Sequence, residues 1–322
     1  MMITYLFPST IVIGVLSIIL FTEASMFALF TLLYPFLYLF DLYARHQRHK
    51  LAQPWSANDK VILITGASSG IGRSLAHVFS KQGSNLILCA RREDYLINVA
   101  NECRDHGATR VITVKCDVTN ENDVSNLIKT VEDSFDKLDC VILNAGVTMG
   151  ERFENIDYQI IKDIMDVNYF GSTNVAYKAL NLLKKTKGSR IVVVDSLAGV
   201  IPLPLRSGYC GSKFALRGFF ETLQIEVWEH EIFVIMTYPG IVATNINEAR
   251  LGNNPIPLNM KGAMSGDECA KIIYEGVCRG DKEIVFTAEG KLGRLMEAVF
   301  PDAFSHLSRK FAWKAITADD AL

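Results

Sequence analysis

Seven short apolar runs, rich in β-branched residues, recur along most of the chain and are separated by longer stretches with helical spacing. Runs of this kind are typical of strands that are buried on both faces of a parallel sheet. The predicted strands are residues 60–65, 85–90, 111–116, 138–143, 191–195, 232–237 and 283–286. The helical stretches include residues 73–82, 158–185 and 207–229. This alternation predicts the α/β fold class, as a doubly wound seven-stranded parallel sheet with helices on both faces.

Residues 1–43 break this alternation and predict a membrane anchor. Glu23 is the only charged residue among the first 40, and residues 3–22 and 24–40 form two apolar blocks. Each block is close to the roughly 20 residues that span a bilayer, as one span or as a hairpin. A cleaved secretory signal and a buried core helix are the alternatives. Basic residues from Arg45 to Lys50 follow, so the positive-inside rule predicts that the remainder of the chain faces the cytosol.

The composition excludes several classes of function. The chain has 322 residues, 49% of them hydrophobic, and a net charge of −2, without the basic excess of nucleic-acid-binding proteins. Its seven cysteines are scattered singly, so we predict neither a disulfide framework nor a metal site, and we expect a reducing compartment. No histidine lies beside a candidate nucleophile, which argues against a Ser/His hydrolase.

A glycine-rich turn follows the first predicted strand. Residues 65–72 read T-G-A-S-S-G-I-G and lead into a predicted helix. Glycines in such a turn let the backbone approach a pyrophosphate, and the free N–H groups of the next helix suit its negative charge. The second strand ends in Arg91-Arg92, where NAD-binding folds usually carry an acidic residue for the ribose hydroxyl. Arginine suits a 2′-phosphate, so we predict NADP(H) over NAD(H); the alternative is a solvated pair that opens the next helix.

Three further positions fit a dinucleotide. Asp117 follows the third strand and could bond the adenine amine or cap the helix that begins near Asn120. Asn144 begins the sequence N-A-G after the fourth strand, where small residues let a cofactor pass. Thr244 follows the sixth strand and is placed to meet the nicotinamide amide.

Tyr209 and Lys213 stand four residues apart and therefore share one face of the predicted helix 207–229. A neighbouring ammonium favours the phenolate, which prepares a tyrosine for proton transfer. Ser196 lies just beyond the end of the fifth strand, where α/β sheets bind ligands. Asn168 is a poor residue for a helix interior, so it either holds a proton-relay water for Lys213 or marks a local kink.

In this order, these motifs closely resemble the short-chain dehydrogenase/reductase family, over residues 60–286. The resemblance implies a Rossmann fold and a catalytic tetrad of Asn168, Ser196, Tyr209 and Lys213, of which Ser196 and Tyr209 would touch the substrate. It implies cofactor contacts from Thr65, Gly66, Ser68, Ser69, Gly70, Ile71, Gly72, Arg91, Asp117, Asn144, Tyr209, Lys213 and Thr244. Two residues depart from the family pattern: Leu143 replaces a frequent asparagine and Asp195 a frequent serine.

The apolar N-terminus and the sequence R-S-x-Y-x-x-S-K resemble most the membrane-anchored 11β-hydroxysteroid dehydrogenase-like and dehydrogenase/reductase-7-type group. The resemblance implies an endoplasmic reticulum membrane. Some of these relatives face the lumen, but here the basic residues follow the anchor, so we expect a cytosolic catalytic domain. The predicted parts are an anchor at 1–43, a basic and polar linker at 44–59, a catalytic domain at 60–290 and an apolar helical extension at 291–322.

We therefore expect an NADP(H)-dependent oxidoreductase that interconverts a carbonyl and a secondary alcohol on a lipid-, steroid- or retinoid-like substrate. An epimerase or dehydratase and a non-catalytic nucleotide-binding membrane scaffold are the alternatives. Arg206 either meets an anionic head group or is a surface arginine in a loop, and the sequence favours the surface arginine. The apolar stripe of residues 291–315 either packs on the domain or a homodimer partner, or dips into the membrane.

Overall fold

The computed structural model describes residues 9–52, 55–244, 246, 248–252, 260 and 262–319, without the side chains of residues 9–24, 26–28, 30 and 311–319. The chain divides into two compact units, Met1–Leu51 and Ala52–Leu322. Helix α1 (Ser9–Ala52) runs without interruption through Pro35, and it includes the first part of the predicted linker.

The membrane span predicted within residues 1–43 is not found in the part of the chain that the structure describes. No helix there is both long enough and apolar enough to cross a bilayer. Among the residues of α1 whose side chains are described, the charged ones begin at Asp41, which limits the apolar stretch there. The first predicted apolar block, residues 3–22, has no described side chain, and for that block the span stays a prediction.

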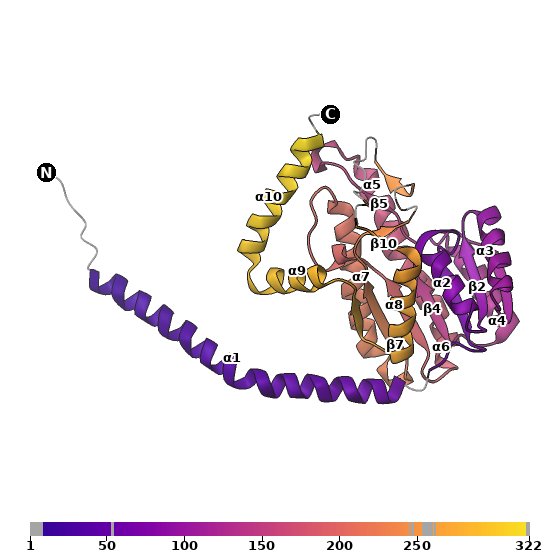
Figure 1. Ribbon diagram of the computed structural model, residues 1–322, viewed down its shortest axis with the longest axis horizontal. Helices are drawn as coiled ribbons and strands as arrows, with labels where there is room; N and C mark the ends of the chain where they lie inside the picture. Colours follow the sequence, from indigo (N-terminus) through magenta and orange to yellow (C-terminus); the bar gives the residue numbers. More distant parts are fainter. Residues whose placement is uncertain are drawn as a thin grey trace. The chain divides into compact units, whose positions relative to one another are not determined.

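Seven strands of the described chain pair in parallel to form the main sheet, in the order β11-β7-β6-β4-β1-β2-β3 (Figure 1). Because the direction of winding reverses between β1 and β4, this is a doubly wound sheet with a switch point at that pair. The strands are β1 (Val61–Thr65), β2 (Asn85–Ala90), β3 (Arg110–Lys115), β4 (Cys140–Leu143), β6 (Arg190–Val194), β7 (Phe233–Tyr238) and β11 (Glu283–Val285). Every predicted strand is confirmed, with shifts of at most two residues at the ends.

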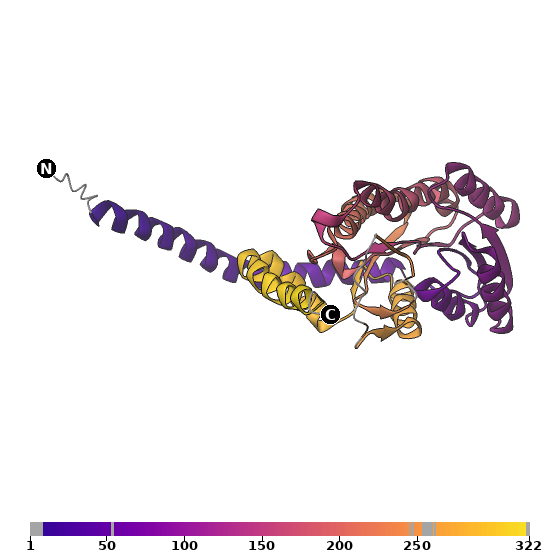
Figure 2. The ribbon, with the colours of Figure 1, turned by 90° about the horizontal axis from the view of Figure 1, so that it is seen from above.

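Helices cover both faces of the sheet, and each face has its own apolar core (Figure 2). One face packs against α2 (Gly70–Ser80), α3 (Glu93–Asp105) and α8 (Gly266–Arg279). The other packs against α4 (Glu121–Phe135), α6 (Ser172–Lys184) and α7 (Ser207–Glu226). The sheet residues are buried on both sides, which explains their nearly continuous apolar runs.

The long predicted helix 158–185 is interrupted, and the C-terminal apolar stretch is divided at Pro301, which already interrupts its helical pattern in the sequence. The stretch 158–185 consists of α5 (Tyr158–Met165), a π-helical turn (Asp166–Gly171) and α6. The C-terminal stretch forms α9 (Ala288–Val299) and α10 (Pro301–Asp319), which are separated at Phe300 because proline cannot continue a helix. Short parallel pairs, β5 (Thr148–Met149) with β9 (Arg250–Leu251) and β8 (Val242–Ala243) with β10 (Met264–Ser265), lie outside the main sheet.

Candidate active site

A cavity of about 590 Å³ lies over the carboxyl ends of the central strands, beside the switch point. This is where doubly wound folds bind their ligands. The cavity gathers predicted site residues that are spread over almost 180 positions of sequence. Those that line it are Gly66, Ser68, Ser69, Gly70, Ile71, Arg91, Asp117, Asn144, Ser196, Tyr209, Lys213 and Thr244. Thr65, Gly72 and Asn168 do not line it, and their contacts show that they support its walls.

The glycine turn between β1 and α2 lines part of the cavity. Gly66 and Gly70 have positive φ angles of 63° and 57°, which favour glycine. A Cβ on Gly72 would lie 2.4 Å from the carbonyl oxygen of Gly66, so no larger residue fits there. The turn leads directly into the N-terminus of α2, whose free N–H groups suit a phosphate. These features fit the pyrophosphate of a dinucleotide.

Hydrogen bonds from β4 hold this turn in place. Thr65 Oγ1 accepts from the backbone N–H groups of Asn144 (2.9 Å) and Ala145 (3.1 Å). The Asn144 side-chain amide donates to the carbonyl oxygens of Thr65 (2.9 Å) and Gly66 (3.2 Å). Thr65 is 2% exposed, and its hydroxyl holds the turn in place; the predicted direct cofactor contact of Thr65 stays a prediction.

Arg91 and Arg92 follow β2 and line the cavity, and Arg92 makes the shorter contacts. Its Nη2 donates to Ser69 Oγ (2.7 Å) and to Ser68 Oγ (3.3 Å). Arg91 is more exposed, and its Nη1 lies 3.9 Å from a carboxylate oxygen of Asp117. The sequence pointed to this pair, but only Arg91 was assigned to the cofactor; both line the cavity.

Asp117 makes a local turn. Its Oδ1 accepts from the backbone N–H (3.0 Å) and the hydroxyl (2.8 Å) of Thr119. Helix α4 is capped by Asn120, whose side chain accepts from the N–H groups of Asn122 and Asp123. The alternative that Asp117 caps this helix is therefore wrong, because the next polar residue takes that role.

Tyr209 and Lys213 both belong to α7 and line the same cavity. Lys213 is 5% exposed, and its ammonium donates to the carbonyl oxygen of Val194 (3.1 Å) at the end of β6. The ammonium also lies 5.8 Å from the centre of the Tyr209 ring. Ser196 lines the cavity beyond β6, and its Oγ accepts from the N–H of Ala198 (3.1 Å). Ser196, Tyr209 and Lys213 thus line one cavity, as the sequence predicted.

Asn168 lies in the π-helical turn and is completely buried. Its Oδ1 accepts from the backbone N–H of Val147 (2.8 Å), and its Nδ2 donates to the carbonyl oxygen of Val147 (3.0 Å) and to Ser212 Oγ (2.9 Å). The Ser212 hydroxyl in turn donates to the carbonyl oxygen of Tyr209 (2.8 Å). The side chain therefore ties this turn to the helix that carries the tyrosine. The predicted water relay to Lys213 stays a prediction.

Asp195 is the unexpected group of the site. Its carboxylate is completely buried, and neither oxygen has a hydrogen-bond partner in the described structure. Burial raises the pKa of Asp195 to about 7, and the ammonium of Lys213, 3.8 Å from Oδ1, opposes that rise. Gly199 closes over it, since a Cβ there would lie 2.5 Å from Oδ2. The sequence marked Asp195 as a departure from the family, but gave it no role.

The likeness to known proteins supports the assignment that this geometry suggests. The family model described as "short chain dehydrogenase" matches residues 60–254. The chain belongs to the short-chain dehydrogenase family, a family of oxidoreductases. It is 38% identical to "11-beta-hydroxysteroid dehydrogenase-like 2" of Arabidopsis thaliana, over 86% of this chain and 88% of that protein. It is 31% identical to "Dehydrogenase/reductase SDR family protein 7-like" of Dictyostelium discoideum, over 89% and 93%. The predicted family and group resemblance are confirmed.

Solved structures of family members superpose on the same fold. An alcohol dehydrogenase from Thermococcus sibiricus, complexed with 5-hydroxy-NADP, has a TM-score of 0.62 at 29% identity and covers 70% of this chain and 93% of its own. A short-chain dehydrogenase/reductase from Burkholderia phymatum, in complex with NAD, has a TM-score of 0.70 at 24% identity, over 76% and 94%. The second likeness shows the fold alone.

Proposed function

We propose that the chain is an NADP(H)-dependent oxidoreductase that interconverts a carbonyl and a secondary alcohol on a hydrophobic substrate. The observation that carries this proposal is that Tyr209, Lys213, Ser196 and the glycine turn line one cavity. The turn would hold the phosphates of a dinucleotide, and Tyr209 would act on a substrate in the same cavity.

The residues around the turn support a nicotinamide dinucleotide with a 2′-phosphate. The first turn of α2 would receive the pyrophosphate, and Asn144 keeps the neighbouring backbone in place. Arg91 and Arg92 line the cavity at the carboxyl end of β2, where a ribose 2′-phosphate would bind. The solved alcohol dehydrogenase with 5-hydroxy-NADP supports the same class of cofactor.

The glycine turn, Asn144 and Lys213 would hold a nicotinamide dinucleotide, which would supply or accept the hydride of the carbonyl/alcohol pair. During reduction, the Tyr209 hydroxyl gives its proton to the oxygen that gains charge, a general-acid step worth roughly 10²–10⁴-fold in rate. The Ser196 hydroxyl donates a hydrogen bond to the same oxygen and orients it. The ammonium of Lys213, held by the carbonyl oxygen of Val194, lies 5.8 Å from the centre of the Tyr209 ring.

Much of the cavity wall is apolar, which supports a lipid-like substrate. Val147, Leu197, Leu203, Ile241 and Ile246 contribute side chains to it. Water cannot hydrogen-bond such a surface, so a hydrophobic substrate body gains free energy there, at about 25 cal/mol for each Å² that it buries.

Arginine variants test the cofactor assignment. We expect Arg91→Ala and Arg92→Ala each to weaken NADPH binding by about tenfold or more, because each removes a charged hydrogen-bond donor. NADH binding should change far less, since NADH lacks the 2′-phosphate. Binding is measured by NADPH fluorescence on the purified full chain in detergent, with Arg104→Ala as a control for an exposed arginine on α3 that does not line the cavity.

The titration tests both the cofactor assignment and the proposed reaction. Equal losses for NADPH and NADH would remove the assignment of the 2′-phosphate to the two arginines. Failure of the folded wild-type chain to bind either nucleotide would overturn the proposed reaction.

A further inference from the structure

Arg206 lines the cavity and has no acidic partner among the described residues. It is half-buried directly before α7, and its Nη1 donates to Thr148 Oγ1 (3.0 Å) and to the carbonyl oxygen of Met149 (2.9 Å). In the described structure no carboxylate oxygen comes within 4.0 Å of its guanidinium, including the buried Glu151 of the facing loop. Arg206 is therefore not a fully exposed arginine, because it is half-buried and lines the cavity.

The guanidinium has unused donors that are not sealed off. Nε and Nη2 of Arg206 make no hydrogen bond within the described residues, yet neither is among the atoms that are both buried and unsatisfied. Because Arg206 lines the cavity and neither atom is both buried and unsatisfied, we expect Nε and Nη2 to be reachable from the cavity. Nε and Nη2 form the edge of the guanidinium that binds a carboxylate or phosphate through two parallel hydrogen bonds.

The electrostatic surroundings leave the positive charge of Arg206 without compensation. Partial burial lowers the pKa of Arg206, because removal from water disfavours the charged guanidinium, and the nearby Arg250 acts in the same direction. The groups that oppose this effect are the Tyr209 hydroxyl and the Cys210 thiol, and neither is a carboxylate. An anion bound from the cavity would replace the water that the guanidinium has lost.

We propose that the substrate of the reaction described above carries an anionic group, a carboxylate or a phosphate, which binds to Nε and Nη2 of Arg206. Arg206 precedes Tyr209 by three residues, about one helical turn, so one substrate could reach both side chains. Leu203 and Val147 line the same cavity with apolar side chains. The substrate class is then a lipid-like carbonyl compound with an anionic head. This inference rests on the proposed function.

Non-reacting ligands test the site without knowledge of the natural substrate. We would measure the binding of octanoate, octyl phosphate and octanol to the full chain, saturated with NADPH, by isothermal titration calorimetry in a non-ionic detergent. The three probes share one alkyl chain, so their differences report the head group. We expect an anion to bind more tightly than octanol, and the better of the two anions identifies the head group as carboxylate or phosphate.

Variants assign that preference to one residue. Arg206→Met should weaken the better anion by about tenfold or more, the loss expected for a charged hydrogen-bonded pair, and should reduce the ratio of anion to octanol affinity. Arg206→Lys should recover part of the ratio, because it restores the charge without the fork of donors. Arg217→Met is the matched control: this arginine lies on α7, is paired with Glu221 and does not line the cavity.

Two results would overturn the inference, and they are distinguishable from failure of the proposed function. Wild-type chain that binds NADPH but prefers neither anion over octanol would remove the anion site and leave the oxidoreductase proposal in place. If Arg206→Met weakened the binding of octanol and of the anions equally, the role of Arg206 would be to support β5 and not to bind an anion. Failure to bind NADPH at the start would overturn the proposed function and this inference together.

Discussion

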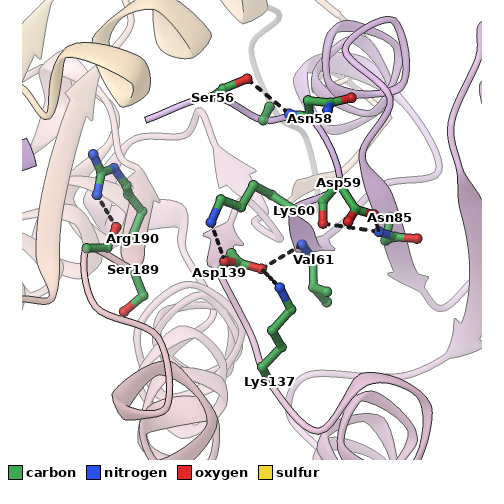
Figure 3. Close-up of polar contacts among 12 residues, drawn as sticks. Ser56, Asn58, Asp59, Lys60, Val61, Asn85, Lys137, Asp139, Ser189 and Arg190 are labelled. Atoms are coloured by element: carbon green, nitrogen blue, oxygen red, sulfur yellow. Dashed lines mark hydrogen bonds and ion pairs between the residues drawn. The ribbon is translucent and has the colours of Figure 1, made fainter. Parts of the chain in front are cut away.

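Two aspartates, Asp139 and Asp195, are buried at opposite ends of the same sheet, and their surroundings differ completely. Asp139 directly precedes β4, and its carboxylate accepts from the Lys60 ammonium (2.9 Å), the Val61 N–H (3.0 Å) and the Lys137 ammonium (3.3 Å), as Figure 3 shows. Asp195 follows β6 and accepts no hydrogen bond in the described structure, with Lys213 at 3.8 Å as its nearest cation. Both carboxylates have no exposed surface.

The difference shows that burial alone does not identify a functional carboxylate. At the amino ends of the strands, the Asp139 carboxylate accepts from two lysines and one backbone N–H, and it fixes the start of β1. At the carboxyl ends, the Asp195 carboxylate has no hydrogen bond in the described structure and only a long ion pair, 3.8 Å, with Lys213, which lines the cavity. Buried charges without hydrogen bonds destabilise a fold, so they are typical of sites where another requirement outweighs stability.

The largest effect that we expect is a pH dependence of the free energy of unfolding, caused by Asp195. Its pKa is raised from 3.8 to about 7 by burial, with Lys213 opposing, so the folded chain binds a proton more tightly than the unfolded chain. The wild-type free energy of unfolding should therefore decrease as the pH rises from about 4 to 7, by on the order of 4 kcal/mol. Asp195→Asn is uncharged throughout and should lack this decrease.

Urea unfolding at pH 5 and pH 8 measures this difference. The free energy of unfolding of Asp195→Asn should exceed that of the wild type at pH 8, and the excess should be smaller at pH 5. The same excess at both values would show that the carboxylate does not titrate near neutrality in the folded chain, and the contrast between the two aspartates would lose its electrostatic basis.

A smaller effect of opposite sign is expected at the other end of the sheet. Asp139→Asn keeps one acceptor oxygen but loses the ion pairs with Lys60 and Lys137, and it turns an amide group toward donors. We expect a loss of about 1–3 kcal/mol in the free energy of unfolding, the usual penalty for leaving buried polar groups unsatisfied. The midpoint of urea unfolding should fall at pH 8 without a change in slope. An Asp139→Asn variant as stable as the wild type would contradict the structural role.

The sequence predicted the sheet well because its strands are buried on both faces. Such strands need continuous apolar runs, and the runs at residues 85–90 and 191–195 mark β2 and β6 to within one residue. The glycine turn and the pair Tyr209 and Lys213 were equally visible, since close backbone approach and helical spacing are local requirements.

Other features depend on contacts that no local pattern encodes. The π-helical turn at Asp166–Gly171 contains Asn168, whose side chain bonds Val147 and Ser212 from other parts of the chain. The burial of Arg206 depends likewise on β5, which packs beside α7 only in the folded domain. The lack of hydrogen-bond partners for Asp195 is also a tertiary property, so the sequence could mark the residue as unusual without predicting its surroundings.

The central claim is that the cavity at the carboxyl ends supports hydride transfer with Tyr209 as the proton donor. The most direct test follows deuterium from NADPH labelled at C4 of the nicotinamide into the alcohol carbon of a panel of lipid-like ketones, some with an anionic head. The wild type should transfer the label, and Tyr209→Phe should do so roughly 10²–10⁴ times more slowly while it still binds NADPH. Label transfer by Tyr209→Phe at the wild-type rate, or no transfer to any ketone by folded chain that binds NADPH, would contradict the account.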